Sequence, residues 1–134
     1  MGRTDDVINV AGHRLSTGSM EAVLAAHPAV AECAVIGVHD ELKGQLPRGL
    51  VVLKSGVDTP AAQVQTELVE LVRSEIGAVA SLRRVDVVAA LPKTRSGKIL
   101  RKTMRQIADG AEVTVPSTIE DASVLEALGP VLRS

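Results

Sequence analysis

Two apolar runs limit what this chain can fold into. Residues 30–38 and 50–53 are dense in valine, isoleucine and leucine. Such runs are typical of strands buried on both faces, and a sheet of that kind is covered by helices. Residues 39–48, between the runs, are mostly polar and are interpreted as a loop.

Helical and strand patterns alternate around these runs. Residues 7–10 and 13–15 flank Ala11-Gly12, which predicts a tight hairpin because glycine adopts positive φ without a steric penalty. The elements that follow are expected in this order: a short amphipathic helix that ends at Pro28, the two buried strands, a helix from Pro60 to Gly77, a strand at 84–88 and a helix from about 99 to 109. The predicted fold class is α+β: a small mixed β-sheet flanked by helices, with an N-terminal β-hairpin.

The composition excludes one class of partner. The chain has no Phe, Tyr or Trp and a formal net charge of −1. Stacking of bases on aromatic side chains is therefore excluded, and the strong basic excess of nucleic-acid-binding domains is missing. We expect no nucleic-acid partner.

Apolar runs, the single cysteine and the histidines bear on the location of the protein and on metal binding. No apolar run approaches the roughly 18 residues of a membrane span, and the first residues do not form a signal peptide. The single cysteine, Cys33, lies in an apolar run and suits a reducing compartment. None of the three histidines has a second ligand at metal spacing. We expect a cytoplasmic protein without a membrane partner or a metal site.

A local cluster of basic residues stands out in this nearly neutral chain. Pro92 and Gly97 mark a loop, and Lys98 lies where that loop enters a helix. Six cations occur from 93 to 105 without an acidic residue between them: Lys93, Arg95, Lys98, Arg101, Lys102 and Arg105. Cations at a helix N-terminus oppose its dipole, so a bound anion would remove this conflict.

The residues alone leave the roles of three positions open. The Gly97-Lys98 pair lacks the first glycine and the Ser or Thr of a phosphate-binding P-loop, so Lys98 is either a mobile catalytic cation or part of a solvated helix start. Gly12 is either a turn glycine or a point where a ligand approaches the backbone. Arg73, near the boundary of a helix face, is either a solvated residue or a ligand contact.

Two separated motifs resemble one family. Residues 2–14 and 91–98, with Glu75-Ile76-Gly77 between them, are similar to the C-terminal domain of AMP-forming acyl-CoA synthetases. The resemblance covers residues 2–110 and is greatest to the acetyl- and propionyl-CoA synthetase branch. It implies a hinge at 2–6, a core at 7–110 and a tail at 111–134, in which one apolar helical patch at 124–128 is expected to pack loosely.

The resemblance implies a ligase that makes an acyl-adenylate from ATP and acetate or propionate, then transfers the acyl group to CoA. Lys98 matches the lysine of the adenylate-forming step. The other matches are Arg3 and Arg14 as nucleotide contacts, Asp5 as the hinge, and Gly12, His13 and Arg73 as CoA contacts. ATP/AMP and CoA are then substrates of the full enzyme, Mg²⁺ accompanies ATP, and this domain alone holds no cofactor.

The chain lacks the large N-terminal adenylation domain of that family, so we expect it to be inactive alone and to need that domain as its partner. The resemblance also implies reversible acetylation of Lys98 by a protein lysine acetyltransferase and a deacetylase. The other basic residues of the cluster are expected to steer the loop toward an acidic transferase surface. The alternative is a stand-alone adaptor whose basic loop binds an acidic protein or RNA.

Overall fold

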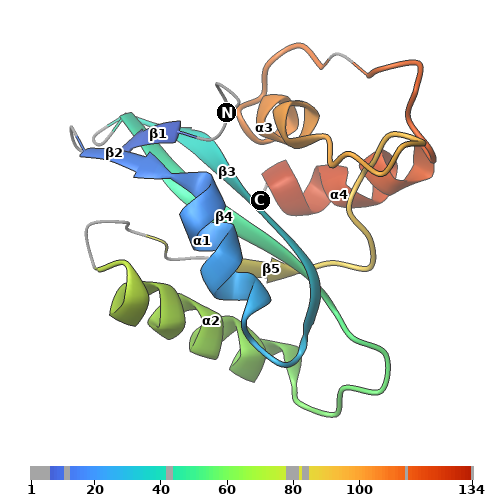
Figure 1. Ribbon diagram of the computed structural model, residues 1–134. Helices are drawn as coiled ribbons and strands as arrows, with labels where there is room; N and C mark the ends of the chain where they lie inside the picture. Colours follow the sequence, from blue (N-terminus) through green and yellow to red (C-terminus); the bar gives the residue numbers. More distant parts are fainter. Residues whose placement is uncertain are drawn as a thin grey trace.

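The computed structural model describes residues 7–10, 13–41, 44–77, 82, 85–113 and 115–133. These residues form a small mixed sheet with helices on both faces (Figure 1). The strands are β1 (Val7–Val10), β2 (His13–Ser16), β3 (Val30–Asp40), β4 (Gly44–Leu53) and β5 (Val85–Val87). The helices are α1 (Thr17–Ala25), α2 (Ala61–Glu75), α3 (Arg101–Ala108) and α4 (Ser123–Arg133). The predicted fold class is confirmed.

Strand β4 is the centre of the sheet. It pairs with β3 in an antiparallel ladder along most of its length and with β5 in parallel at Gly49–Val51. Strands β1 and β2 form the predicted hairpin, and Val10 of β1 pairs with Gly44 at the start of β4. Strand β3 therefore lies at an edge of the sheet among the described residues.

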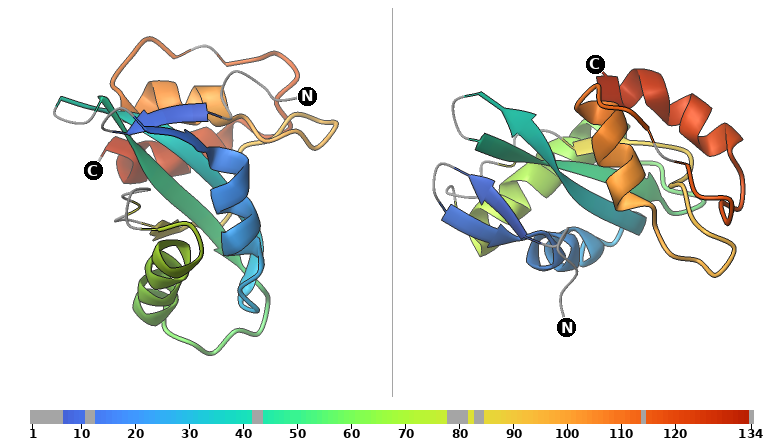
Figure 2. Two further views of the ribbon diagram at one scale, coloured as in Figure 1. Left: turned by 60° about the vertical axis from the view of Figure 1, so that its left-hand side comes forward. Right: turned by 90° about the horizontal axis from the view of Figure 1, so that it is seen from above.

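Alternating side chains of the two central strands enter separate cores. Val35 and Val51 belong to the core beneath α1 and α2, whereas Ile36 and Leu50 belong to the core beneath α3 and α4. Successive side chains of a strand point to opposite faces, so one pair of apolar strands supplies both cores. The prediction of strands buried on both faces is confirmed. Figure 2 shows the two helical layers from other directions.

The prediction of a loop at residues 39–48 is wrong. Strand β3 continues to Asp40 and β4 begins at Gly44, so most of this stretch lies in the β3–β4 ladder.

Arg48 is 8% exposed and its guanidinium donates hydrogen bonds to the carbonyl oxygens of Val131 and Leu132. Those carbonyls lie in the last turn of α4, where backbone acceptors lack helical partners and a cation is favourable. Arg48 also forms an ion pair with Asp86 of β5.

The expectation of a loosely packed tail is also wrong. Helix α4 places Leu125, Leu128 and Leu132 in the core with Met104 and Ile107 of α3, and Leu128 and Leu132 are at most 2% exposed. Residues 123–133 are thus an integral layer of the fold.

Candidate functional site

Lys98 lies on a short hairpin immediately before α3. Lys93 and Ile99 form an antiparallel bridge, and the Thr94 amide donates to the Lys98 carbonyl oxygen at 2.8 Å. The Gly97 amide closes the turn by donating to the Thr94 carbonyl oxygen at 2.8 Å, and Gly97 has φ +92°. Glycine adopts this left-handed conformation without the clash that a Cβ causes. We call residues 93–99 the Lys98 hairpin.

The Thr94 side chain strengthens the turn from inside. Its hydroxyl oxygen accepts from the Lys98 amide at 3.1 Å and lies 2.9 Å from the Ser96 hydroxyl oxygen. Side chains of Ser and Thr commonly bond to nearby backbone in turns. Backbone and side chain together restrict the position of the Lys98 backbone.

A segment from the tail pairs with the outer side of this hairpin. Thr94 forms an antiparallel bridge with Ile119. The Arg95 amide donates to the Thr118 carbonyl oxygen at 2.9 Å, and the Glu120 amide donates to the Lys93 carbonyl oxygen at 2.8 Å. Figure 2 shows the Lys98 hairpin at the periphery, beside the segment that leads into α4. The tail therefore contributes directly to the candidate site.

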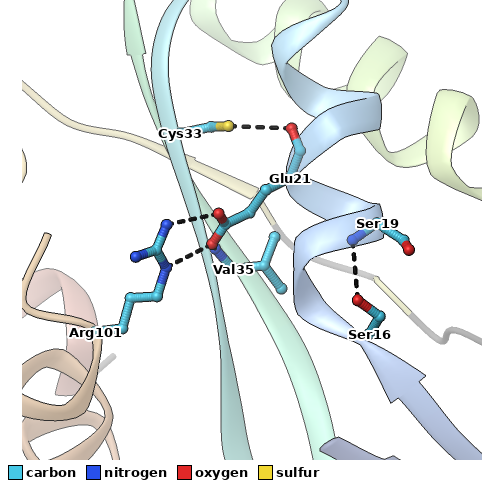
Figure 3. A network of polar contacts seen from close by, with 6 residues as sticks. All are labelled: Ser16, Ser19, Glu21, Cys33, Val35 and Arg101. Carbon is cyan, nitrogen blue, oxygen red and sulfur yellow. Dashed lines mark hydrogen bonds and ion pairs between the residues drawn. The ribbon is translucent and has the colours of Figure 1, made fainter. Parts of the chain in front are cut away.

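Two ion pairs join the start of the hairpin and the start of α3, which follows it, to the body of the domain. Lys93 pairs with Glu32 of β3. On the other side, Nε and Nη2 of Arg101 donate to Oε2 and Oε1 of Glu21 at 2.7 and 2.6 Å (Figure 3). Sequence reasoning missed both carboxylates, although the cations at the start of α3 pointed to a nearby anion. Glu21 is one such anion.

The basic cluster is therefore divided between structural and exposed cations. Lys93 and Arg101 have carboxylate partners, which corrects the expectation that they act with the others as steering charges. Arg95, Lys98 and Lys102 are exposed. Among the described residues, none is hydrogen-bonded to or ion-paired with the Lys98 ammonium group. That group can reach a bound anion.

The other predicted site residues lie elsewhere or outside the described residues. Arg73 is exposed on α2 and lines an open groove of about 520 Å³ with Gln65, Glu70 and Asp86. Helix α2 and the Lys98 hairpin are on opposite faces of the sheet, so the structure does not bring Arg73 and Lys98 together.

Arg3, Asp5 and Gly12 lie outside the described residues. His13 and Arg14 are in β2, where their backbones pair with Val10 and Asn9.

The described residues contain neither a metal-binding cluster of three or more ligand residues nor a membrane-spanning helix. Within the described ranges, no group of three or more His, Cys, Asp or Glu residues could hold a metal ion. In the same part of the chain, every helix is too short or too polar to cross a membrane.

A half-buried thiol adjoins the Glu21–Arg101 pair. The Cys33 thiol donates to the Glu21 carbonyl oxygen at 3.3 Å (Figure 3). Burial, aided by the negative charge of Glu21, raises the pKa of the Cys33 thiol to about 11. Cys33 is thus a packed, largely un-ionised residue in this network.

Comparison with known proteins shows which family this chain matches. Residues 19–98 match the AMP-binding enzyme C-terminal domain. The chain is 57% identical over 94% of its length to the mitochondrial acyl-CoA synthetase short-chain family member B of Dictyostelium discoideum, of which it covers 18%. It is 48% identical over 94% of its length to an acetyl-coenzyme A synthetase of Pyrobaculum arsenaticum, of which it covers 19%.

The fold is shared with solved structures of such enzymes. A crystal structure of Brucella canis acyl-CoA synthetase aligns with 79% of this chain and 19% of that chain, at 40% identity and a TM-score of 0.70. The chain spans about a fifth of the length of the curated relatives it matches. The family resemblance of residues 2–14 and 91–98 is confirmed. The family match ends at Lys98 and spans more than half of the sequence. Because of that span, the chain belongs to the family of AMP-binding enzyme C-terminal domains.

Proposed function

We propose that this chain is the mobile C-terminal domain of a short-chain acyl-CoA synthetase. The complete enzyme converts acetate or propionate, ATP and CoA to acyl-CoA, AMP and pyrophosphate. The observation that carries this proposal is the exposed Lys98 ammonium group on a hydrogen-bonded hairpin, at the last residue of the family match. The large N-terminal adenylation domain supplies the acyl pocket and is the principal partner.

Lys98 acts in the first step by electrostatics. Negative charge is shared between the attacking carboxylate and the phosphate oxygens as the acyl-adenylate forms, and a nearby cation stabilises it. At about 4 Å and an effective dielectric of about 20, one such contact contributes about 4 kcal/mol. That energy corresponds to roughly a thousandfold in rate. A rigid backbone and a flexible side chain suit this task.

The remaining roles are assigned by matching position. Arg3 and Arg14 contact the nucleotide, and Asp5 lies in a hinge at residues 2–6, followed by a core at 7–110 and a tail at 111–134. Gly12 and His13 line the path of the CoA thiol arm in the second step. Arg73 contacts the nucleotide end of CoA, and its exposure beside an open groove supports this assignment.

The cofactor proposals follow from the same assignment. ATP and CoA are substrates of the complete enzyme, and Mg²⁺ accompanies ATP. We place the enzyme in the cytoplasm.

Lys98 is also the proposed site of regulation by a protein lysine acetyltransferase and a deacetylase. Acetylation removes the positive charge that the first step needs. The exposed Arg95 and Lys102 steer an acidic transferase surface toward Lys98. After incubation with a protein acetyltransferase and acetyl-CoA, mass spectrometry should find Lys98 modified in preference to the other lysines, at a rate that falls with salt. Those lysines are Lys43, Lys54, Lys93 and Lys102. Uniform labelling of all lysines would reject this proposal.

The function is tested by carboxylate-dependent release of AMP from ATP. We expect the complete enzyme to release AMP and pyrophosphate with acetate or propionate and CoA, and this chain alone to release none. Absence of turnover with any short-chain acid would contradict the proposal. Salt-sensitive binding of an acidic protein or RNA by this chain alone, without such turnover, would instead support the adaptor alternative.

A further inference from the structure

Two carboxylates bind cations at either side of the Lys98 hairpin: Glu32 binds Lys93 at its start, and Glu21 binds Arg101, two residues after its end. We propose that Glu21 and Glu32 are positioning residues for Lys98: they set where its ammonium group lies without touching the substrates themselves. This inference rests on the proposed role of Lys98 in adenylate formation.

Glu21 controls the side of the hairpin that leads into α3. Arg101 is three residues after Lys98 and forms two parallel hydrogen bonds with the Glu21 carboxylate. The Arg101 and Glu21 side chains are only 13% and 15% exposed. A two-bond pair of this kind restricts orientation as well as distance. Removing one partner leaves the other charge poorly solvated.

The same carboxylate is tied to the sheet. Oε2 of Glu21 accepts a hydrogen bond from the Val35 amide of β3 at 2.9 Å (Figure 3). Because β3 is an edge strand among the described residues, this amide faces away from β4 and would otherwise lack a strand partner. Glu21 thus joins three elements, α1, β3 and α3, at one point.

Glu32 controls the opposite end of the hairpin. It lies three residues before Val35 on β3, and its carboxylate pairs with Lys93. The Lys93 and Glu32 side chains are 26% and 38% exposed, so water and salt weaken this contact more than the Glu21–Arg101 pair. Both carboxylates place the hairpin relative to the same strand, and Glu21 has the larger effect.

Positional control of this kind affects one half-reaction. A cation that is displaced by about 1 Å from a developing charge can lose about a hundredfold in rate. The thioester-forming step does not use Lys98 in the proposed mechanism. A purely structural role for Glu21 would instead lower both steps together, since it would weaken the whole domain.

The test compares Glu21→Gln and Glu32→Gln in the complete enzyme. We expect Glu21→Gln to lower kcat for adenylate formation about tenfold to a hundredfold. Thioester formation from supplied acyl-adenylate should change less than twofold. Glu32→Gln should give a smaller loss in the same step. High salt should reproduce that loss in the unmodified enzyme.

Hydrogen exchange measured by mass spectrometry reports the hairpin directly. Peptides that cover residues 93–99 should exchange faster in Glu21→Gln, whereas peptides from α2 should not change. Glu67→Gln is the matched control, because Glu67 of α2 pairs with His27 in the turn that follows α1, away from the hairpin. Glu32→Lys alone should speed the exchange of residues 93–99, because it breaks the ion pair with Lys93. The double variant Glu32→Lys with Lys93→Glu should restore slow exchange of these residues, because it rebuilds the ion pair with the charges reversed.

Two results would overturn the inference: unchanged exchange of residues 93–99 in Glu21→Gln, or equal losses in the two half-reactions. These results are distinct from failure of the proposed function. If Lys98→Ala kept full adenylation, the role of Lys98 would be rejected, while hydrogen exchange would still decide whether Glu21 and Glu32 position the hairpin.

Discussion

Arg48 of β4 and Asp86 of β5 form a buried ion pair, with Nε and Nη2 of Arg48 at 3.0 and 2.9 Å from Oδ2 of Asp86. The Arg48 guanidinium also binds the last carbonyls of α4, so one side chain links two strands and the C-terminal helix. A charge in this position needs its partners because little water reaches it.

Loss of the Asp86 carboxylate should therefore destabilise the domain. We expect Asp86→Ala to lower the free energy of unfolding by about 3–5 kcal/mol, since it leaves a buried guanidinium without its charge partner. Chemical denaturation of the complete enzyme and its variants measures this change. Glu70→Ala is the control. Glu70 is exposed on α2 and lines the same groove as Asp86, and its loss should change the free energy of unfolding by less than about 0.5 kcal/mol. Similar values for the two variants would show that the Arg48–Asp86 pair is dispensable.

The Lys98 hairpin depends on a glycine in the left-handed region. Because φ of Gly97 is +92°, Gly97→Ala should lower the free energy of unfolding by about 1–2 kcal/mol through backbone strain. Nothing lies within 4 Å of an added Cβ, so no steric clash adds to this cost. Gly18→Ala is the control: it lies in α1, and its Cβ would meet Ser16 at an ordinary 3.5 Å. We expect it to be neutral or to stabilise by up to about 1 kcal/mol. Equal effects in thermal unfolding would contradict this explanation.

The contact between α2 and the turn that follows α1 should weaken in acid. Hydrogen bonds from Gln63 and then His27 hold the pKa of Glu67 below its ordinary value of 4.5. A lowered folded-state pKa stabilises the fold above the unfolded-state pKa, and this contribution disappears as pH falls through the folded-state value. The stability difference between the unmodified chain and Glu67→Gln should thus shrink as the pH falls below about 4.5. A difference that grows toward acid would have the wrong sign.

Cys33 should react slowly with alkylating reagents. Burial raises its thiol pKa from 9.0 to about 11, so its thiolate fraction near neutral pH falls about a hundredfold. A profile of iodoacetamide modification rate against pH should rise through pH 10, later than that of N-acetylcysteine under the same conditions. An inflection near pH 8 to 9 would show that the thiol is not shielded.

The sheet and its covering helices could be predicted because their signals are local. The valine-rich runs at residues 30–38 and 50–53 alternate between two cores, and the period of α2 places Val64, Leu68 and Val72 on one buried face. The hairpin of β1 and β2 was likewise indicated by a glycine between two short apolar segments.

The missed features depend on contacts between distant residues. Arg48 meets its carbonyl partners 83 and 84 residues later, so its polar neighbours alone suggested a loop. Glu21 and Arg101 are 80 residues apart, and Glu32 and Lys93 are 61 apart. The motif at residues 91–98 indicated Lys98 as a candidate, but only the fold shows which carboxylates and which tail segment hold its hairpin.

The most direct test of the central claim is the separation of the two half-reactions in Lys98→Ala. In the complete enzyme, we expect carboxylate-dependent adenylate formation to fall by about a thousandfold or more, in line with the loss of one close cation. Thioester formation from supplied acyl-adenylate and CoA should stay close to that of the unmodified enzyme. Lys102→Ala, an exposed cation at the start of α3, should leave both steps unchanged. Equal losses in both half-reactions of Lys98→Ala would contradict the account.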